Sequence, residues 1–416
     1  MPYRPAILRE LGEFLALLGL LAFAAVVRPL SLLWPKDRQL VAFLPREGVR
    51  YTDNVAHMYA NLKLSGQLPE SAYLLVTDPR VEKIWRARGR SVRLYAPYSL
   101  KELHLYLRTG VIVTDSWQWV LGGRYSCFRG AKKVQIWHGI PLKKIERSNL
   151  GWVRRTGLRG LVVRVRDWAI GRYPRYDLVV STSRFFAEHA FAKSFLASRY
   201  PDTGYPRNDL LLTAPGEEAP VDADEFTLRA LSRLKAKGKR TVLYAPTFRD
   251  TGGGPFEDYA LDLLELHEFA QANDVVLVVK LHPYVTDPPP SFLWPHVMVY
   301  DASKDAAGLL KLTDLLVTDY SSIYFDYLLL DRPTVFFPYD FDKYYRYDRS
   351  FLFDYEEYTP GPKCFDQATL LTTVLKELES PDARWQAART TLKAKSFTHA
   401  DGSASLRLWR EIETLR

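Results

Sequence analysis

Two series of short apolar runs limit what this 416-residue chain can fold into. The runs are QLVAFLP (39–45), SAYLLVTD (71–78), VIVTDS (111–116), KKVQIWHG (132–139), YDLVVSTS (176–183), RTVLYAPTF (240–248), DVVLVVKLHP (274–283), VMVYD (297–301), DLLVTDYSS (314–322) and RPTVFFPYD (332–340). Runs rich in Val, Ile and Leu that alternate with helical stretches, such as 53–64, predict parallel strands covered by helices on both faces. Because a Pro-, Gly- and acid-rich segment at 213–225 divides the two series, we expect two α/β domains joined by a linker.

Histidines follow two of these runs. A ligand of a two-domain α/β protein binds at the carboxyl ends of the strands, in the cleft between the domains. His138 in IWHGIPLKK and His282 in KLHP each stand at such an end, one in each series. Either histidine alone is more often a packing residue. The pair, facing one cleft, can transfer protons near neutral pH, and we predict that both are catalytic.

A helix start in the second series predicts an anion site. The strand-like LLVTDY leads into SSIYFDYLLL, so Ser321 and Ser322 are expected to open a helix. Hydroxyls and free backbone N–H groups at a helix start suit an anion, although serine also caps helices for structural reasons. Asp326, one turn further on, is placed to bind a ribose hydroxyl or is simply a solvated acid. The second series contains no GxGxxG or GxxxxGK[ST] phosphate loop.

Composition narrows the class of protein. The only cysteines, Cys127 and Cys364, lie far apart and lack metal-ligand spacing, which argues against a disulfide framework or a zinc site and fits a reducing compartment. A net charge of +9 favours an anionic partner: nucleic acid, an anionic membrane or a phosphorylated substrate. No nucleic-acid-binding module is recognisable, so a nucleic-acid binder is the weakest of the three.

The N-terminus favours the membrane. Residues 14–27 read FLALLGLLAFAAVV and carry no charge, but these 14 residues are too short to span a bilayer. No small-residue cleavage site follows, which weakens a signal-peptide interpretation. A buried core helix is the alternative. We favour a membrane-embedded or interfacial segment over residues 1–38, with basic residues on both sides of the apolar run.

A basic stretch after His138 points the same way. Residues 143–172 contain nine Lys or Arg against two acids, and apolar residues recur there at helical spacing. The stretch is either a solvated face on an ordinary helix or a basic amphipathic helix for an anionic membrane surface, and we favour the second. The expected acceptor and membrane contacts are Lys143, Lys144, Arg154, Arg155, Arg159, Trp152 and Trp168.

Six blocks of the chain carry a family resemblance. They are IWHGIPLKKI, GYPRND (204–209), VLYAPTFRD (242–250), KLHP, VTDYSSIYFDYLLLDRPTVFFPYDFDKY (317–344) and DGSASLR (401–407). Together and in this order they resemble the signature blocks of the CDP-glycerol glycerophosphotransferases, which build teichoic acids and related capsular polymers. The resemblance extends from about residue 43 to the C-terminus and does not cover the apolar N-terminus.

The resemblance implies a GT-B-like fold, with two Rossmann-like domains facing a cleft. It also implies transfer of glycerol phosphate from CDP-glycerol to a hydroxyl, with CMP leaving. His138 and His282 match the two essential histidines, with His138 as the general base. The donor-binding residues would be Arg249, Thr247, Ser321, Ser322, Asp326 and Lys280. Two residues depart from the family pattern: Ile140, where Thr or Ser is usual, and Lys280, where Arg is frequent and a bidentate phosphate contact is lost.

The sequence and the resemblance together predict the segments of the chain, its partners and its location. The segments are 1–38 (membrane-associating), 39–212 (acceptor domain), 213–225 (linker), 226–385 (donor domain) and 386–416 (C-terminal helix returning to the first domain). We expect no metal and no cofactor beyond the donor. The expected partners are a lipid-linked (polyprenyl diphosphate) glycan acceptor and an anionic membrane surface, with no nucleic acid. The expected location is the cytoplasmic face of a bacterial membrane, peripheral or anchored through the N-terminal segment.

Two alternatives stay open for the reaction. A CMP-sugar-dependent GT-B glycosyltransferase of the sialyl or Kdo type also uses His-Pro and Ser-Ser elements. A polymerase that uses CDP-ribitol belongs to the same family, and the sequence does not distinguish glycerol from ribitol. Short family members include primases, and a basic patch suits an acceptor held at a membrane. We therefore favour a primase-like enzyme, which adds a first unit, over a polymerase.

Overall fold

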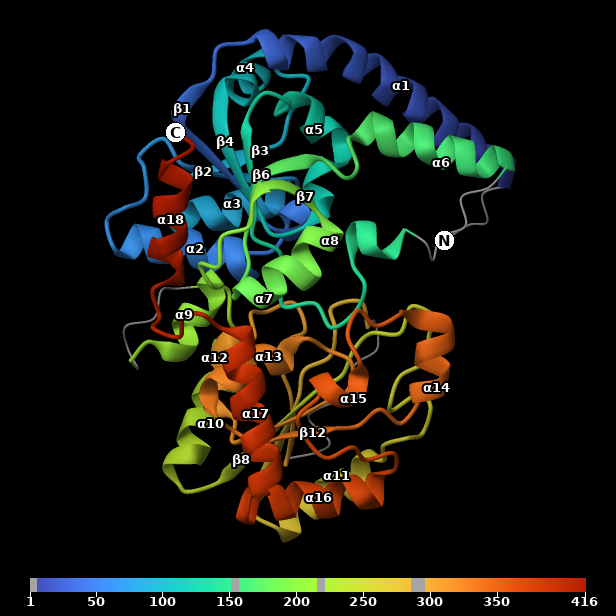
Figure 1. Cartoon of the computed structure of the whole chain (residues 1–416), viewed down its shortest axis with the longest axis vertical. Coiled ribbons are helices and arrows are strands. Elements are labelled where there is room, and N and C mark those ends of the chain that lie inside the picture. The colour runs from blue at the N-terminus through green and yellow to red at the C-terminus, as the bar shows by residue number, and fades with distance from the viewer. Residues whose placement is uncertain (1–5, 151–156, 215–220, 286–295) are drawn as a thin grey trace.

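The computed structural model describes residues 6–150, 157–214, 221–285 and 296–416 and contains two parallel sheets. Figure 1 shows strands β1 to β7 in one half of the molecule and the later strands, such as β8 and β12, in the other. The predicted α/β class with parallel sheets is therefore confirmed.

The first sheet has the order β3-β2-β1-β4-β5-β6-β7, and all neighbours are parallel. Its strands are β1 (Asp37–Leu44), β2 (Tyr73–Val76), β3 (Val92–Leu94), β4 (Thr109–Thr114), β5 (Lys132–Gln135), β6 (Arg175–Val179) and β7 (Leu196–Arg199). Leu44 pairs with Thr114 and Thr114 with Gln135, so three strands end at one edge. The segments that follow β1, β4 and β5 therefore start side by side.

The second sheet has the order β10-β9-β8-β11-β12 and is also parallel. Its strands are β8 (Arg240–Ala245), β9 (Val275–Val279), β10 (Val297–Val299), β11 (Leu315–Thr318) and β12 (Thr334–Phe336). Thr318, the last residue of β11, pairs with Ala245 on one side and Phe336 on the other. The loops after these strands again share one edge.

Helices cover both sheets. Beside the first lie α1 (Ala6–Leu33), α2 (Asp53–Leu64), α3 (Pro79–Ala87), α4 (Leu100–Arg108), α5 (Arg124–Cys127), α6 (Gly157–Ile170), α7 (Arg184–Phe186), α8 (Ala192–Ser194) and α9 (Pro206–Leu212), with the 3-10 segments η2 (Trp117–Gly123) and η3 (Glu146–Asn149). The second half contains α10 (Glu225–Ala236), α11 (Leu263–Ala272), α12 (Ala307–Leu312), α13 (Ile323–Tyr327), α14 (Phe341–Lys343), α15 (Tyr355–Tyr358), α16 (Gln367–Glu379) and α17 (Ala383–Ser396), and the chain ends in α18 (Ala404–Glu413).

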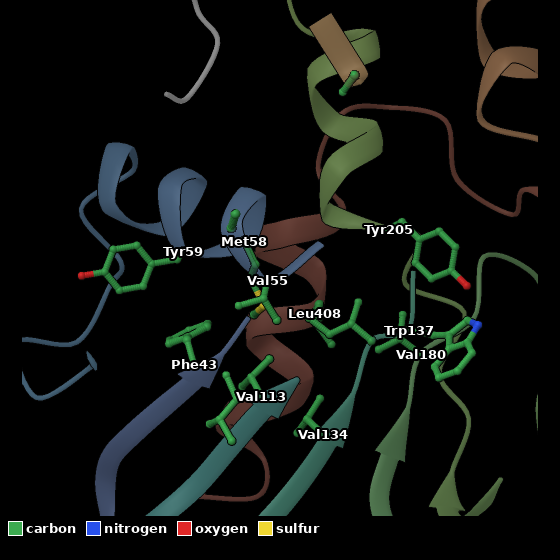
Figure 2. Packing of buried hydrophobic residues seen from close by; sticks show 14 of the residues in the cluster. Phe43, Val55, Met58, Tyr59, Val113, Val134, Trp137, Val180, Tyr205 and Leu408 are labelled. Atoms are coloured by element: carbon green, nitrogen blue, oxygen red, sulfur yellow. The ribbon is translucent and has the colours of Figure 1, made fainter. Parts of the chain in front are cut away.

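The last helix, α18, packs on the half that holds the first sheet (Figure 1). Asp209 of α9 accepts hydrogen bonds from the N–H groups of Ala404 (2.7 Å) and Ser405 (2.8 Å), and so satisfies the start of α18. Figure 2 shows Leu408 of α18 in the core with Phe43 of β1 and Met58 of α2. All three side chains are fully buried. The C-terminus is thus part of the first half's core.

One expected strand is shorter than predicted, and two strands were missed. Of the predicted run 132–139 only Lys132–Gln135 forms a strand, because Trp137 has a φ of +62° and leaves the strand. Strands β3 and β7 were not predicted; β3 has three residues, and β7 is largely exposed and lacks an apolar run. These two are the edge strands of the first sheet, where few side chains are buried.

The apolar N-terminal run forms α1, and its segment Phe14–Leu33 is long and apolar enough to cross a membrane, by length and composition. Only 17% of its most apolar window is buried, which does not fit a buried core helix. The helix lies beside α6 (Figure 1), and its Arg28 donates to the carbonyl oxygens of Trp168 (3.0 Å) and Ala169 in α6. The charge that interrupts the apolar run is therefore turned toward the protein.

Candidate active site

A cavity of about 850 Å³ is lined by residues that follow strands of both sheets. Most of the predicted site residues lie in its wall: His138, His282, Thr247, Lys280, Ser321, Ser322, Asp326, Lys143 and Lys144. The fold therefore brings the two histidines, the helix start and three of the predicted lysines to one solvent-accessible space.

The backbone around His138 is held by specific hydrogen bonds. Trp137 has a φ of +62° and Gly139 a φ of +144°, so both neighbours leave strand geometry. The Trp137 N–H donates to Oε1 of Gln135 (3.0 Å), and the Trp137 carbonyl accepts from Nδ2 of Asn54 (2.8 Å). A non-glycine residue at positive φ costs about 1–3 kcal/mol and persists only where its surroundings fix it. Here Gln135 and Asn54 do so.

The His138 ring has a defined tautomer. Its Nδ1 lies 2.8 Å from the carbonyl oxygen of Asp115, which can only accept, so Nδ1 carries the proton and Nε2 the lone pair. Burial, reinforced by Arg46, lowers the pKa of His138 to about 3. The ring stacks on Trp137 with centroids 4.0 Å apart. A neutral imidazole with an unprotonated Nε2 has the form that a general base needs.

The His282 ring has the opposite tautomer. The backbone N–H of Tyr284 donates to Nδ1 of His282 (3.3 Å), so the proton of the neutral ring lies on Nε2. The ring contacts Phe248 and Tyr284, with centroids 5.6 and 4.7 Å away. Burial, together with nearby cations, Arg46 first, lowers the pKa of His282 to about 3. His282 therefore offers the cavity a neutral N–H donor.

Basic side chains give the cavity a positive wall. Burial, with Arg349 nearby, lowers the pKa of the Lys143 ammonium to about 7, and its Nζ donates to the Tyr344 hydroxyl (3.1 Å). Burial likewise lowers the pKa of Lys280 to about 8. Arg46 and Arg50 also line the space. Cations that are buried together favour an anionic ligand, because its negative charge stabilises their protonated, charged forms.

Several carboxylates of the wall already have cationic partners. Asp326 pairs with Arg207, Glu146 with Arg172, and Asp250 with Arg349. Among the residues that the structure describes, no group of three or more His, Cys, Asp or Glu side chains could hold a metal ion. The carboxylates therefore leave much of the positive charge of Arg46, Lys143 and Lys280 uncompensated.

Gly139 allows the loop after β5 that carries His138 (the histidine loop) to approach Ser321 and Ser322. Ser322 precedes α13, and its side chain makes no capping hydrogen bond. A methyl group at Gly139 would lie 3.0 Å from the Ser322 hydroxyl and 3.1 Å from Nη2 of Arg207. At a φ of +144° a side chain is also strained. Glycine is therefore needed where the two halves meet.

Arg249 is the predicted site residue that the structure places elsewhere. Its guanidinium pairs with Asp319 (2.7 Å) and, through two bonds of 2.8 Å, with Asp340, and it is 1% exposed. It lies behind the cavity wall, where it fixes the loop that carries Thr247, whose carbonyl accepts from Nη1 (2.5 Å). With its donors taken, Arg249 does not face the cavity in this arrangement.

Sequence reasoning missed Arg207 as a site residue. It is the second residue of α9, within the GYPRND block, lines the cavity, and donates to the His138 carbonyl (2.8 Å), to Asp53 (2.8 Å) and to Asp326 (2.5 Å). The block was noticed only as part of the resemblance. A single arginine in a helix start gives no signal of its own, because its three partners come from distant parts of the chain.

The expected acceptor and membrane residues divide into groups. Lys143 and Lys144 line the cavity. Trp168 is 65% exposed on α6, next to exposed Leu161, Val162 and Val165. Trp152, Arg154 and Arg155, and the side chain of Arg159, lie outside the described residues.

The comparison with protein families decides the family. The model of the CDP-glycerol:poly(glycerophosphate) glycerophosphotransferases matches residues 26–414, which include both sheets and the cavity. The chain belongs to this family. The resemblance inferred from the six blocks, and the prediction of a transferase of this kind, are thereby confirmed.

Proteins similar to this chain include a transferase, a polymerase and a primase of teichoic acid. The teichoic acid glycerol-phosphate transferase of Staphylococcus aureus is 32% identical over 290 residues, which are 67% of this chain and 70% of that protein. The teichoic acid poly(glycerol phosphate) polymerase of Bacillus subtilis is 27% identical over 84% of this chain but only 45% of its own length. A glycerol-phosphate primase of Bacillus spizizenii is 32% identical over 59% of this chain and 60% of its own.

Solved structures agree on the fold. The wall teichoic acid polymerase TagF superposes with a TM-score of 0.72 at 24% identity, over 91% of this chain and 89% of that structure. At this identity the likeness supports the architecture alone.

Proposed function

We propose that this enzyme transfers glycerol phosphate from CDP-glycerol to a hydroxyl of a lipid-linked glycan, releasing CMP, in teichoic acid or related polymer synthesis. One observation carries the proposal: two neutral histidines with opposite tautomers line one positively charged cavity. One ring can accept a proton and the other can donate a hydrogen bond, and the surrounding cations suit a diphosphate.

His138 is the general base. Nε2 takes the proton of the acceptor hydroxyl as that oxygen attacks the phosphorus that bears the glycerol. The Nδ1–H bond to the Asp115 carbonyl stabilises the imidazolium that forms and holds the ring in place. The bond between this phosphorus and the bridging oxygen breaks, and CMP leaves with the electron pair. A low pKa keeps the base unprotonated before the reaction.

The donor lies against the second half. His282 donates from Nε2 to the diphosphate, where charge develops on the leaving CMP. Lys143 and Lys280 supply charge, and Ser321, Ser322 and the Thr247 loop supply hydroxyls and backbone donors. Oδ1 of Asp326 forms no hydrogen bond within the described part of the chain, so it can accept from a ribose hydroxyl while Oδ2 stays on Arg207. Arg249 supports this wall from behind.

The two sheets then correspond to the two Rossmann-like domains of a GT-B enzyme, 39–212 for the acceptor and 226–385 for the donor. The linker is 213–225, and 386–416 returns to the first domain. Polar bonds between the halves favour a cleft that closes on the substrates: the Tyr284 hydroxyl donates to Glu47 (2.8 Å), and the backbone of Lys143 pairs with that of Phe351. Substrate closure of this kind excludes water from the reaction.

The membrane surface is formed by α1 and α6. Exposed apolar side chains gather on both helices: Phe14, Leu15, Leu18, Val26, Leu30, Leu32 and Leu33 on α1, and Leu161, Val162, Val165 and Trp168 on α6. Because α1 packs along α6 and turns Arg28 inward, an in-plane position on the cytoplasmic face of a bacterial membrane suits it better than a free span. Anionic lipid would complement the basic stretch at 143–172.

Point variants test this membrane surface better than removal of residues 1–38, because Ala24, Val27 and Ser31 of α1 are buried. Leu15→Ser with Leu18→Ser and Val26→Ser should abolish sedimentation with vesicles that contain anionic lipid. Phe226→Ser with Leu264→Ser, which removes exposed apolar side chains from the other half, is the matched control. Equal binding by both variants would contradict an α1 surface.

A primase-like activity fits an acceptor held at that surface. The cavity extends to Trp117, Glu146 and Arg172, and Arg172 comes two residues after the end of α6. A lipid-linked disaccharide can therefore reach His138 while its diphosphate and lipid stay at the membrane. Mass spectrometry of products made with excess CDP-glycerol tests this: one added unit supports a primase, and a ladder of many units would show a polymerase.

A donor screen tests the reaction. The full-length protein is incubated with acceptor and with CDP-glycerol, CDP-ribitol or CMP-sialic acid, and CMP release is measured. We expect release from CDP-glycerol above the other two. Preference for CDP-ribitol would change the polyol, and preference for CMP-sialic acid would replace the proposal by a CMP-sugar glycosyltransferase.

A further inference from the structure

The Arg207 side chain bonds the histidine loop and the opposite half at once. Nη1 donates to the His138 carbonyl (2.8 Å) and to Oδ1 of Asp53 (2.8 Å), while Nη2 donates to Oδ2 of Asp326 (2.5 Å). Its side chain is 15% exposed, and those of Asp53 and Asp326 are 15% and 5% exposed. A planar guanidinium fixes such partners in direction as well as distance.

The bond to His138 acts on a backbone that needs support. Trp137 at φ +62° and Gly139 at φ +144° flank the histidine. Asn54 holds the Trp137 carbonyl through Nδ2, and its Oδ1 accepts from the backbone N–H of Arg207 (3.1 Å). Arg207 therefore supports the loop directly at residue 138 and indirectly through Asn54, so it helps to decide where the imidazole points.

The bond to Asp326 depends on the other half. Asp326 belongs to α13, which follows Ser321 and Ser322, and Nη2 of Arg207 and the Ser322 hydroxyl both approach Gly139. If the halves separated, Arg207 would lose Asp326 but keep Asp53. The guanidinium is thus fully held only when the wall that carries the serines is docked on the histidine loop.

We propose that Arg207 is a positioning residue that aligns His138 with the donor site, and that it does so through the contact with Asp326. The proposal rests on the proposed function, because it assigns the base role to His138. Arg207 itself touches no reacting atom; it acts on the His138 carbonyl and on a carboxylate of the donor wall.

The test compares variants of the full-length protein: Arg207→Gln, Arg207→Lys, Asp326→Asn and the Arg207→Gln/Asp326→Asn double variant. Arg199→Gln is the matched control, because Arg199 lies in the same half and pairs with Glu411 on the surface (2.9 Å). Arg207→Gln should lower kcat for CMP release by about tenfold to a hundredfold, as expected for a misplaced catalytic group, and leave KM for CDP-glycerol within about twofold. Arg207→Lys should recover part of the loss.

The double variant and the CMP affinities test whether Arg207 acts through Asp326. Because both residues act through one link, the double variant should have a kcat similar to that of Arg207→Gln rather than the product of two losses. Calorimetry should find CMP affinity unchanged in Arg207→Gln and weakened in Asp326→Asn, which loses charge at the ribose position. If the two losses in kcat multiply in the double variant, the proposal is wrong. It is also wrong if Arg207→Gln changes only KM and the CMP affinity.

A measurement without turnover separates this inference from the reaction. In nitrogen-15 NMR of histidine-labelled protein, the His138 ring signals should move in Arg207→Gln and stay in place in Arg199→Gln. If the wild-type protein releases no CMP from CDP-glycerol, the proposed function fails, and the ring signals still decide whether Arg207 positions His138. Unmoved His138 signals in Arg207→Gln would overturn the positioning role.

Discussion

The loop after β5 and the loop after β9 each bring a histidine to the cavity, but they hold the ring by different groups. At His138 the Nδ1–H donates to a carbonyl, and Gln135, Asn54 and Arg207 fix the backbone on either side. At His282 the Nδ1 accepts one backbone N–H at 3.3 Å, and aromatic rings supply most of the packing.

This difference separates the two roles. A base must present its lone pair to one oxygen in one direction, so a loop with several fixed hydrogen bonds suits it. A donor to a diphosphate faces several oxygens and tolerates a looser setting. Two similar sequence contexts, each a strand end followed closely by a proline, thus hold imidazoles with complementary hydrogen-bonding capacity.

The largest expected effect comes from replacing each histidine by glutamine. The amide N–H of Gln can replace an Nε2–H donor but cannot accept a proton as a base. His138→Gln should lower CMP release by about 10²–10⁴, the usual contribution of a general base. His282→Gln should stay within about tenfold of the wild type, since it keeps a donor. Equal losses at both positions would mean that the two histidines do not differ in this way.

Removing the hydrogen-bond donor at position 282 should cost less activity than removing the base at position 138. His282→Ala should slow CMP release by about 10- to 150-fold, because a hydrogen bond to a charged group contributes about 1.5–3 kcal/mol. Rapid-quench kinetics with saturating CDP-glycerol measure the chemical step. A loss in CDP-glycerol affinity alone, with the chemical step unchanged, would assign His282 to ground-state binding.

Acid should destabilise the protein through these rings. Their pKa falls from the ordinary 6.5 to about 3 on folding, so between these values the unfolded chain binds protons that the native protein does not. The contribution to the free energy of unfolding is complete above about pH 6.5 and is lost as the pH falls toward 3. Denaturant unfolding at several pH values should give a shallower pH dependence for His138→Gln than for the wild type. An unchanged slope would show that the ring is not buried as a neutral group.

Much of the fold could be predicted because it depends on local patterns. The helix expected at 53–64 forms α2 at Asp53–Leu64, and the Val- and Leu-rich runs form the inner strands. The candidate site could be predicted in outline, since the ends of parallel strands meet at one edge.

The parts of the site that could not be predicted depend on contacts between residues far apart in the sequence. The tautomer of His138 is set by a carbonyl at the end of β4, and Arg207 gains its role from three partners far away in the chain. The family resemblance implied that Arg249 binds the donor, but Asp319 and Asp340 pair with its guanidinium.

The smallest expected effect is a proton taken up with the donor. At pH 8 the Lys143 side chain, whose pKa burial lowers to about 7, is mostly neutral in the free enzyme. A diphosphate beside it should raise this pKa, so CDP-glycerol binding should take up about one proton. Calorimetry in buffers of different ionisation enthalpy measures this uptake. Lys143→Met should abolish most of it and Lys144→Met, at an exposed neighbouring position, should not; equal uptake in both would place the diphosphate away from Lys143.

The most direct test of the central claim is the tautomeric state of the two rings in the wild-type protein. Long-range proton–nitrogen NMR of nitrogen-15-labelled histidines, assigned with His138→Gln and His282→Gln, distinguishes the protonated ring nitrogen at pH 7. We predict two neutral rings, with the proton on Nδ1 of His138 and on Nε2 of His282. The same tautomer in both rings, or a protonated imidazolium at either position, would contradict the assignment of one base and one donor.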